Sequence, residues 1–408
     1  MNYEEAVAWL YASQLHGIKL GLENIQRLLA ALDIRVSGPA APRFLHVAGT
    51  NGKGSVCAML EACCRAAGKR TGLFTSPHLV TFRERVRIDG EMLSEQEVAD
   101  GLSEIRGCAA DWDHAPTFFE ITTALALLWF QRKGVEVVAL ETGMGGRLDA
   151  TNAVTPAVSI LTPIDLDHQQ WLGNSLAAIA REKAGIMKSG VPAVSAPQAE
   201  EVKVVFNEVA AEKDSPLTYV TAPLSGYEVS LAGSHQPWNA AVAVKALELA
   251  GLNLPASAIE QGLRSIVWPG RFQLIEERYI LDGAHNPAAA RRLAATWQEV
   301  YGEKRATLVL GILRDKDMLG IVESLIPIAG RILAVPVQNP RSATPQEISK
   351  IIGQVAPRQE CIAVRDLPAA IRIAKSMERR ALITGSLYLV GEALAYFGQS
   401  GPPEPSLH

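Results

Sequence analysis

The chain has 408 residues, of which 48% are hydrophobic and 20% are charged, a composition typical of folded globular proteins. This length exceeds what one hydrophobic core usually serves, so we expect two domains, or three. The net charge of −4 gives no electrostatic case for binding nucleic acid, and no apolar run approaches the roughly 20 residues of a membrane span.

The chain starts with an acidic, amphipathic stretch, MNYEEAVAWLYAS, which does not look like a secretory signal. Five cysteines show neither a CxxC pair nor zinc-ligand spacing: Cys57, Cys63, Cys64, Cys108 and Cys361. This pattern fits reduced, mostly buried thiols, so we expect a cytoplasmic protein without cysteine chemistry.

The first functional feature is a glycine-rich turn inside FLHVAGTNGKGSVCAML, residues 44–60. An apolar strand leads through three glycines into a helical pattern, so successive N–H groups can point into one concavity at a helix N-terminus that favours an anion. The spacing differs from the common phosphate-binding pattern because Gly54 separates Lys53 from Ser55. We favour nucleotide binding, with Lys53 reaching the terminal phosphates; an ordinary strand-to-helix turn is the alternative.

Strand-like and helical stretches alternate through the rest of this region. Candidate strands are RFLHVAG, RTGLFTS, VEVVALETG, AVSILTPI and PAVSA, with helical patterns such as SVCAMLEACCRAAG and TFFEITTALALLWFQRKG between them. The alternation predicts an α/β fold, with a doubly wound, mostly parallel sheet covered on both faces. Polar clusters follow four of the strands, and ligands bind at the carboxyl ends of such strands, so we expect one shared site.

A break at SIVWPGRFQLIEE, residues 265–277, separates this region from a second strand–helix alternation. We therefore expect a first domain over residues 1–268 and a linker over residues 269–276. A smaller, Rossmann-like α/β domain should cover residues 277–398, and the Pro-rich tail over residues 399–408 should be loose.

Ionisable side chains follow two strands near the phosphate loop. Glu141 emerges from a buried strand, where a magnesium ligand is favoured over a structural ion pair with Arg147. His168 follows another strand, and a lone histidine there is more often a hydrogen-bonded loop residue than a ligand. Asp165 and Asp167 beside it suit either metal binding or support of a ligand.

Other positions stay open when the sequence is taken alone. Lys183, in AREKAGIMKSG, looks like a surface lysine near the end of a helix. The second domain carries LDGAHNP, which places Asp282, His285 and Asn286 on a strand-to-helix turn. A ribose contact by Asp282 and helix capping by Asn286 are equally favoured there.

Taken together, these segments resemble the folylpolyglutamate synthase/dihydrofolate synthase family, within the wider Mur-type amide ligases. Ten segments carry the likeness in the right order: HGIKLGLENI, HVAGTNGKGS, TSPHL…ERVRIDG, ETGMGGRLDATN, DHQQWLG, REKAGIMKSG, GSHQPWNA, PGRFQ, LDGAHNP and GILRDKD. They span nearly the whole chain, and GTNGKGS is the form of phosphate loop that this family uses. The resemblance therefore accounts for the unusual spacing of the loop.

The resemblance implies Mg-ATP as a co-substrate, with two magnesium ions. The implied ATP contacts are Thr50, Asn51, Gly52, Lys53, Gly54, Ser55, Asn239, Arg271 and Asp282. The implied metal ligands are Ser76, Glu141, His168 and Lys183, the last as a lysine carbamylated by carbon dioxide, which gives it a carboxylate-like end. The implied catalytic residues are Lys53, Lys183 and His285.

For the second substrate the resemblance implies a pterin site. Its implied residues are Ile18, Lys19, Leu20, Thr117, Phe118, Phe119, Glu120, Leu148, Asp149 and Ala150. Phe118 or Phe119 would stack on the flat pterin ring, with a core aromatic as the alternative for each. The implied reaction joins L-glutamate to dihydropteroate, to reduced folates, or to both, through an acyl phosphate, in folate biosynthesis and one-carbon metabolism.

Two other functions compete with this interpretation. A ligase joining an amino acid to a UDP-muramyl peptide would share the phosphate loop and the metal site, but we see no UDP-binding domain ahead of the loop. A non-catalytic nucleotide switch would not explain a second domain with nucleotide contacts of its own. We expect a monomer that acts on small molecules and binds neither nucleic acid nor a membrane.

Overall fold

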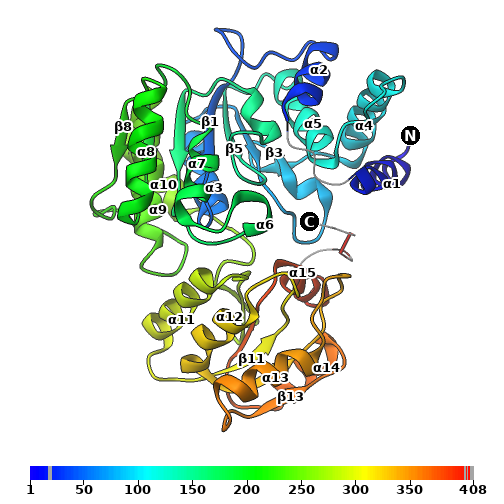
Figure 1. Cartoon of the computed structure of the whole chain (residues 1–408), viewed down its shortest axis with the longest axis vertical. Helices are drawn as coiled ribbons and strands as arrows, with labels where there is room; N and C mark the ends of the chain where they lie inside the picture. Colours follow the sequence, from blue (N-terminus) through cyan, green and yellow to red (C-terminus); the bar gives the residue numbers. More distant parts are fainter. Residues whose placement is uncertain (17–20, 399–400, 402, 405–408) are drawn as a thin grey trace.

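The computed structural model of the chain describes residues 1–16, 21–398, 401 and 403–404. Two α/β domains lie one above the other along the long axis in Figure 1, with α6 (Gln169–Leu172) and α15 (Leu387–Tyr396) near their junction. The α/β class and the two-sheet architecture expected from the sequence are confirmed.

The first domain is built on an eight-stranded sheet in the order β4-β3-β2-β5-β1-β6-β7-β8. The strands from β2 to β8 in this order are parallel, whereas β3 and β4 add an antiparallel edge. Their bounds are β1 (Arg43–Ala48), β2 (Thr71–Phe74), β3 (Val86–Ile88), β4 (Glu91–Met92), β5 (Val137–Glu141), β6 (Val158–Leu161), β7 (Ala193–Ser195) and β8 (Leu217–Tyr219). The sequence patterns predicted β1, β2, β5, β6 and β7.

Helices cover both faces of this sheet. One face carries α3 (Lys53–Ala66), α9 (Gln236–Leu249) and α10 (Ala256–Arg264). The other carries α1 (Tyr3–Ala12), α2 (Glu23–Ala31), α4 (Glu95–Ala109), α5 (Phe118–Arg132), α7 (Leu176–Ala184) and α8 (Glu200–Glu212). Along β1, Leu45 and Val47 join the core under α3, while Phe44 and Ala48 join the cores on the opposite face. Because both faces are apolar, polar side chains gather where the strands end.

The second domain has a six-stranded sheet in the order β13-β12-β11-β14-β10-β9, in which β9 alone is antiparallel to its neighbour. Its strands are β9 (Gln273–Ile275), β10 (Tyr279–Leu281), β11 (Ala306–Leu310), β12 (Ala329–Ala334), β13 (Cys361–Ala363) and β14 (Ala381–Thr384). The helices α11 (Pro287–Tyr301), α12 (Met318–Leu325) and α13 (Pro345–Val355) cover one face, and α14 (Leu367–Lys375) and α15 cover the other. Strand β9 lies within residues 269–276, where the sequence suggested a linker.

An apolar seam joins the domains. Leu79 and Val80, which follow β2 in the first domain, pack into the core formed by α14, α15 and the second sheet. A Cβ atom at Gly391 of α15 would lie 2.0 Å from the Leu79 carbonyl oxygen, so α15 meets the first-domain backbone directly. This contact requires glycine at position 391 and holds the second domain beside the end of β2.

The described part of the C-terminal tail is anchored, although the sequence suggested a loose segment. The Glu404 carboxylate accepts hydrogen bonds from the Tyr3 hydroxyl at 2.9 Å and the Phe82 N–H at 2.8 Å. It also accepts one from the Thr81 hydroxyl at 2.9 Å. Its own N–H donates to the Val80 carbonyl at 2.7 Å. Glu404 therefore connects α1 with the start of the 3₁₀ helix η2 (Phe82–Arg85).

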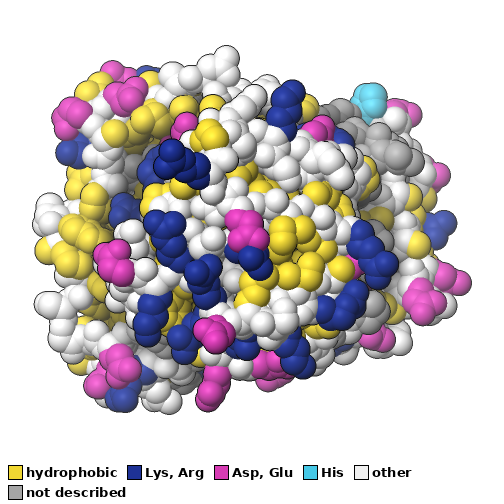
Figure 2. All heavy atoms as spheres, turned by 90° about the horizontal axis from the view of Figure 1, so that it is seen from below, with side chains coloured by type: hydrophobic (Ala, Val, Ile, Leu, Met, Phe, Trp, Pro, Cys, Tyr) yellow, Lys and Arg dark blue, Asp and Glu magenta, His cyan; other side chains and the backbone are white. Residues whose placement is uncertain are grey.

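Charged side chains are mixed on the end of the molecule that Figure 2 shows, where lysines and arginines stand among acidic and apolar side chains. In the second domain Arg331 pairs with Glu360, and Arg365 pairs with Asp366. No helix in the described part of the chain combines the length and the apolar character that crossing a bilayer requires.

Candidate active site

The glycine-rich turn connects β1 to α3 at the carboxyl end of the first sheet. Gly49 and Gly52 have φ values of +154° and +90°, a region that favours glycine. A Cβ atom at position 49 would also lie 1.8 Å from the Thr162 hydroxyl oxygen. At position 54 a Cβ atom would lie 3.1 Å from the Trp268 indole nitrogen, which explains a glycine between Lys53 and the hydroxyl residue. The loop thus ends at the N-terminus of a 14-residue helix, whose first N–H groups face an approaching anion.

Lys53 and Glu141 face each other across the ends of β1 and β5. The Lys53 ammonium donates to the Gly49 carbonyl at 3.1 Å and lies 4.0 Å from Glu141 Oε1. Glu141 Oε2 accepts a hydrogen bond from the Ser76 N–H at 3.1 Å. Burial raises the pKa of Glu141 above its ordinary value, although Lys53 lowers it in part. The alternative ion pair with Arg147 is not formed, because Arg147 pairs with Glu182.

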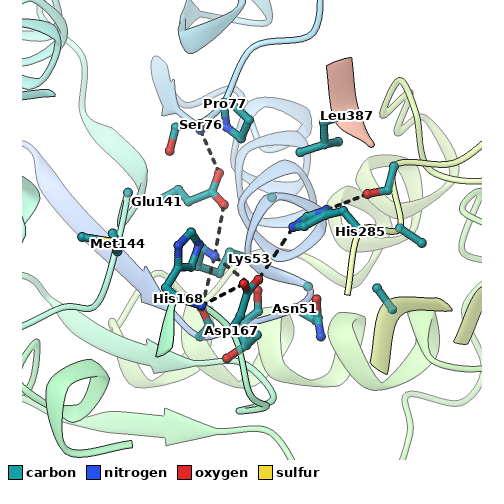
Figure 3. Close-up of a pocket in the computed structure, with 18 of the residues that line it drawn as sticks. Asn51, Lys53, Ser76, Pro77, Glu141, Met144, Asp167, His168, His285 and Leu387 are labelled. Carbon is teal, nitrogen blue, oxygen red and sulfur yellow. Dashed lines mark hydrogen bonds and ion pairs between the residues drawn. The ribbon is translucent and has the colours of Figure 1, made fainter. Parts of the chain in front are cut away.

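His168 and Asp167 form the next part of the site, just beyond β6. Figure 3 shows Ser76, Glu141, His168 and Lys53 converging on one space. Burial lowers the pKa of His168 to about 4, so its imidazole is neutral and able to act as a ligand at pH 7. Asp167 accepts from the His168 N–H at 2.9 Å.

Asp167 also pairs with a lysine of the second domain. Lys316 Nζ lies 2.7 Å from Asp167 Oδ1, and both side chains are nearly buried. Burial alone would raise the pKa of Asp167, but the charge and hydrogen bond of Lys316, together with His168 and His285, hold that pKa well below its usual range. The sequence analysis did not assign Lys316, although it lies in GILRDKD, one of the segments that carry the family resemblance.

Lys183 is buried in α7, so the interpretation as a surface lysine was wrong. The residue is only 4% exposed, and its ammonium donates to the Gly49 carbonyl at 2.9 Å. Burial and the nearby Lys53 charge lower the pKa of Lys183 to about 7. A substantial fraction of this amine is therefore uncharged near neutral pH, beside the phosphate loop.

The strand-to-helix turn after β10 brings second-domain side chains to the same space. Asp282 accepts hydrogen bonds from the backbone N–H groups of Phe272 and Ala284, both at 2.9 Å. Asn286 caps α11 by accepting from the Ala289 N–H at 2.8 Å, which confirms the capping interpretation. The same side chain donates to Asn51 in the phosphate loop at 3.1 Å, so it also bridges the domains.

His285, Arg271 and Asn239 complete the polar part of the site. His285 Nδ1 donates to the Gly283 carbonyl at 2.7 Å, and Nε2 lies 3.8 Å from Asp167 Oδ2. Burial lowers the pKa of His285 to about 4, so the ring is neutral at pH 7. Arg271 Nη1 donates to the Gly270 carbonyl at 3.1 Å, and Asn239 Nδ2 donates to Gln236 at 3.0 Å. Arg271 and Asn239 both line the same cavity.

An aromatic wall forms the other end of the cavity. Phe118 stacks on Tyr11, with ring centroids 5.7 Å apart and planes 17° apart. Phe119 lies 5.9 Å from Phe74, and a Cβ atom at Gly143 would lie 2.5 Å from its ring. Both phenylalanines also line the cavity, so each is at once a packed aromatic and part of the wall.

The polar side chains predicted for this wall bond within the chain. Thr117 and Glu120 form a capping box at the start of α5, with the Thr117 N–H and hydroxyl donating to Glu120 Oε2 at 2.7 and 2.9 Å. Asp149 accepts from the N–H groups of Gly143 and Met144, both at 2.9 Å, and from Thr151. Leu148 and Ala150 contribute apolar surface. The predicted contacts Ile18, Lys19 and Leu20 lie outside the described residues.

One continuous cavity of about 570 Å³ joins these parts. Its lining includes, from the first domain, Thr50, Asn51, Gly52, Lys53, Gly54, Ser55, Ser76, Thr117, Phe118, Phe119, Glu120, Glu141, Leu148, Asp149, Ala150, His168, Lys183 and Asn239. From the second part of the chain it includes Arg271, Asp282, His285, Lys316, Arg341 and Ser386. The structure thus brings together every described residue that the family resemblance assigned to the site, whereas Asp165 does not line the cavity.

Comparison with known proteins identifies the class. The Mur ligase middle domain matches residues 47–219, and the domain described as Mur ligase, glutamate ligase domain matches residues 270–387. The chain is therefore a Mur-type ligase. It is 36% identical to the dihydrofolate synthase/folylpolyglutamate synthase of Escherichia coli (strain K12), over 95% of this chain and 94% of that protein. The chain belongs to the dihydrofolate synthase/folylpolyglutamate synthase family.

Solved structures agree over nearly the full length. E. coli FolC in complex with DHPP and ADP is 34% identical, covers 97% of this chain and 98% of its own, and has a TM-score of 0.87. The bifunctional folylpolyglutamate synthase/dihydrofolate synthase of Yersinia pestis complexed with AMPPNP and Mn ion is 33% identical, covers 98% of each chain, and also has a TM-score of 0.87.

Proposed function

We propose that this protein is an ATP-dependent ligase that joins L-glutamate to the carboxyl group of a pterin-bearing acid, dihydropteroate, a reduced folate, or both. One observation carries the proposal: a single cavity has a phosphate loop at one end, an aromatic wall at the other, and a second domain over it. The names of its relatives and the ADP, DHPP and AMPPNP bound by them support the same reaction. No observation favours a UDP-muramyl-peptide substrate.

ATP binding is assigned to the loop and to the second domain. Thr50 to Ser55 would receive the phosphates, with the Lys53 ammonium and the N-terminus of α3 offsetting their charge. Arg271, Asn239 and Asp282 line the adjacent space. Both oxygens of Asp282 already accept backbone N–H groups, so a ribose hydroxyl would use its remaining lone pairs.

The residues present fit a magnesium ion held largely by phosphate oxygens. Among the described residues no group of three or more His, Cys, Asp and Glu side chains could hold a metal by itself. Magnesium in phosphate-transfer sites usually takes one or two carboxylates and completes its shell with phosphates and water. Glu141, Ser76 and His168 converge as such a partial donor set (Figure 3). When bound, the metal would neutralise charge on the phosphates.

Carbamylation of Lys183 would complete a second ligand set. Only an uncharged amine attacks carbon dioxide, and the buried Lys183 has its pKa lowered to about 7. Within the described chain Lys183 has no carboxylate partner within ion-pair distance, so its charge is not stabilised by a salt bridge. Conversion to a carbamate would place an anionic oxygen ligand next to Gly49 and Glu141, where a cationic cofactor favours it.

The reaction follows from these positions. The carboxylate of the pterin acid attacks the γ-phosphorus of ATP, so ADP leaves and an acyl phosphate forms. Lys53 and Arg271 stabilise the charge on the transferring phosphoryl group. The amine of glutamate then attacks the acyl carbon, phosphate leaves, and the amide bond forms. His285 is neutral, and its Nε2 atom can accept a hydrogen bond or proton from that amine.

The contacts between the domains suit a site that excludes water. Asn51 bonds to Asn286 and Asp167 pairs with Lys316, so the phosphate loop and the second domain meet directly over the cavity. An acyl phosphate hydrolyses when water reaches it, so this closure would protect the intermediate.

The test is product formation by the purified protein. We expect Mg-ATP, labelled glutamate and either dihydropteroate or tetrahydrofolate to give a product heavier by one glutamyl residue, with one ADP released per amide formed. The two acceptors tested separately decide which of the two folate activities is present. ADP release that needs neither glutamate nor a pterin acid would contradict the proposal.

We further propose that the protein acts as a monomer in the cytoplasm. All five cysteines are free, and Cys57, Cys63 and Cys64 are buried, which suits a reducing compartment. Sedimentation at working concentration tests the monomer, and fractionation of the source cell tests the compartment. A stable dimer, or recovery outside the cytoplasm, would contradict the respective proposal.

A further inference from the structure

Among the described residues, one polar side chain that lines the cavity, Gln14, has no hydrogen-bond partner for its amide. Gln14 lies in the 3₁₀ helix η1 (Ser13–His16) and lines the cavity. Its amide nitrogen and its amide oxygen are both shielded from solvent, and neither forms a hydrogen bond within the described structure. A buried amide without partners is uncommon, because the hydrogen bonds that water gave it have been lost without replacement.

The position of Gln14 is fixed by its neighbours on the aromatic wall. Tyr11, three residues earlier on α1, stacks on Phe118. The Ser13 hydroxyl, one residue earlier, donates to the Leu10 carbonyl within the same turn. Gln14 therefore follows a packed helix end whose Tyr11 contacts Phe118. Its side chain lines the cavity, while its two polar amide atoms are closed to solvent.

The neighbouring polar side chains differ from Gln14 in having partners within the chain. The carboxylates of Glu120 and Asp149 and the hydroxyl of Thr117 already bond within the chain. Both oxygens of Asp149 and the Oε2 atom of Glu120 are thus already engaged by groups of the chain itself. Gln14 keeps one donor group and one acceptor unused side by side, so a rotation of its side chain toward the cavity would let it bond to the edge of a flat ring.

We propose that Gln14 determines specificity for the bicyclic ring of the pterin acid by pairing with its cyclic amide edge. That edge presents a ring N–H next to a carbonyl oxygen. The Gln14 oxygen would accept from the ring N–H, and the Gln14 amide N–H would donate to the ring carbonyl. The inference rests on the proposed function, because it assigns the residue that selects the acceptor substrate of that reaction.

The pairing explains why an unsatisfied group is kept in the free protein. A site that holds a hydrogen-bonding group for its substrate discriminates strongly against analogues that lack the matching group, because the group then stays unpaired. Phe118 and Phe119 supply stacking surface that would accept many flat rings. Gln14 would add directional hydrogen bonds, which the phenylalanine rings cannot form.

The first experiment uses Gln14→Met, which keeps an unbranched side chain of similar length and removes both polar atoms. We expect the KM for the pterin acid to rise about tenfold, as loss of neutral hydrogen bonds does, with the KM values for ATP and glutamate unchanged. The melting temperature of the free protein should not fall, since a buried unpaired amide is replaced by an apolar group. Gln26→Met, at an exposed position of α2, is the matched control and should change neither quantity.

The second experiment removes the partner from the substrate. An acceptor methylated on the ring N–H should bind the wild-type protein about tenfold more weakly than the parent compound. In Gln14→Met the two acceptors should have KM values much closer together, because the contact is already absent. Equal loss in both proteins would overturn the pairing.

Two further outcomes would also overturn it. An unchanged pterin KM in Gln14→Met would remove Gln14 from recognition. A lower melting temperature with parallel rises in all three KM values would show a structural role instead. Both outcomes leave glutamate ligation by the wild-type protein intact, whereas absence of pterin-dependent ADP release from the wild type would instead contradict the proposed function.

Discussion

The two ends of the cavity differ in how their polar side chains are satisfied. At the phosphate-loop end, Glu141 and Lys183 are buried beside Lys53, and the pKa shifts of Glu141 and Lys183 reflect their burial and the charge of Lys53. At the aromatic end, Thr117, Glu120 and Asp149 form hydrogen bonds with other groups of the chain. The phosphate-loop end is therefore suited to binding and transferring charged groups, whereas the aromatic end is suited to holding a ring of fixed shape.

The largest effect should come from the charged end. Replacing Lys53 by Ala removes the cation at the phosphate loop, so ADP release that depends on pterin and glutamate should fall about 10³-fold. A coupled assay of ADP at saturating substrates measures it. Lys69→Ala, which removes an exposed lysine paired with Glu136, is the matched control and should retain full activity. Comparable turnover by both variants would show that the loop is not the site of phosphate transfer.

A smaller loss should follow a change at Lys183. The substitution Lys183→Arg keeps a positive charge but cannot form a carbamate, so activity should fall about 10²-fold if the modified lysine holds a metal. The wild type should also lose activity when carbon dioxide and bicarbonate are removed and regain it when bicarbonate is added. Lys188→Arg changes a nearby lysine that donates to the Asn152 carbonyl and serves as the control. Bicarbonate independence of the wild type would argue against carbamylation.

The contact between the domains should have an intermediate effect. Asp167→Asn and Lys316→Met each break a nearly buried ion pair, and the double variant should be less damaged than the sum of the two. The expected coupling is about 2 kcal/mol in unfolding free energy, measured by denaturant titration of the four proteins in a double-mutant cycle. Additive effects would show that the pair does not help to dock the second domain on the site.

The smallest effect is predicted at the aromatic end. Glu120→Ala should lower the unfolding free energy by about 1 kcal/mol, because it removes half of the capping box of α5. The KM for the pterin acid should stay within about twofold, since the carboxylate bonds to Thr117 rather than into the cavity. A large rise in that KM with unchanged stability would show that Glu120 binds the pterin acid and does not mainly cap α5.

Much of the charged end could be predicted because local sequence encodes it. The glycines between β1 and α3 are required by backbone angles and by close neighbours such as Thr162. The phosphate loop can therefore be recognised from the spacing of its glycines. Five parallel strands of the first sheet, β1, β2, β5, β6 and β7, were predicted from apolar runs, whereas the short parallel strand β8 was not. The short strands β3 and β4 carry too few residues for a pattern, and their antiparallel pairing depends on contacts that no local signal encodes.

The sequence-based predictions failed for residues whose burial depends on contacts with distant parts of the chain. Lys183 looks like a surface lysine in its own helix, and its partner, the Gly49 carbonyl, lies 134 positions earlier. Lys316 likewise gains its role only because Asp167 approaches it from the other domain. Thr117 and Glu120 are a different case, since the T-x-x-E spacing of a capping box is visible in the sequence. The family resemblance implied substrate contacts for both residues, but the hydrogen bonds of their side chains in the described structure are those of the capping box.

The hydrogen bond between Tyr3 and Glu404 brings together two residues that are 401 positions apart in the chain. A short bridging peptide there would let the chain be opened elsewhere, for example at the exposed turn around Gly302, whose added Cβ would meet no atom within 4 Å. Such a rearranged protein should keep its site intact, whereas a bulky fusion partner placed beside residue 404 would press on the segment that leads from β2 into η2.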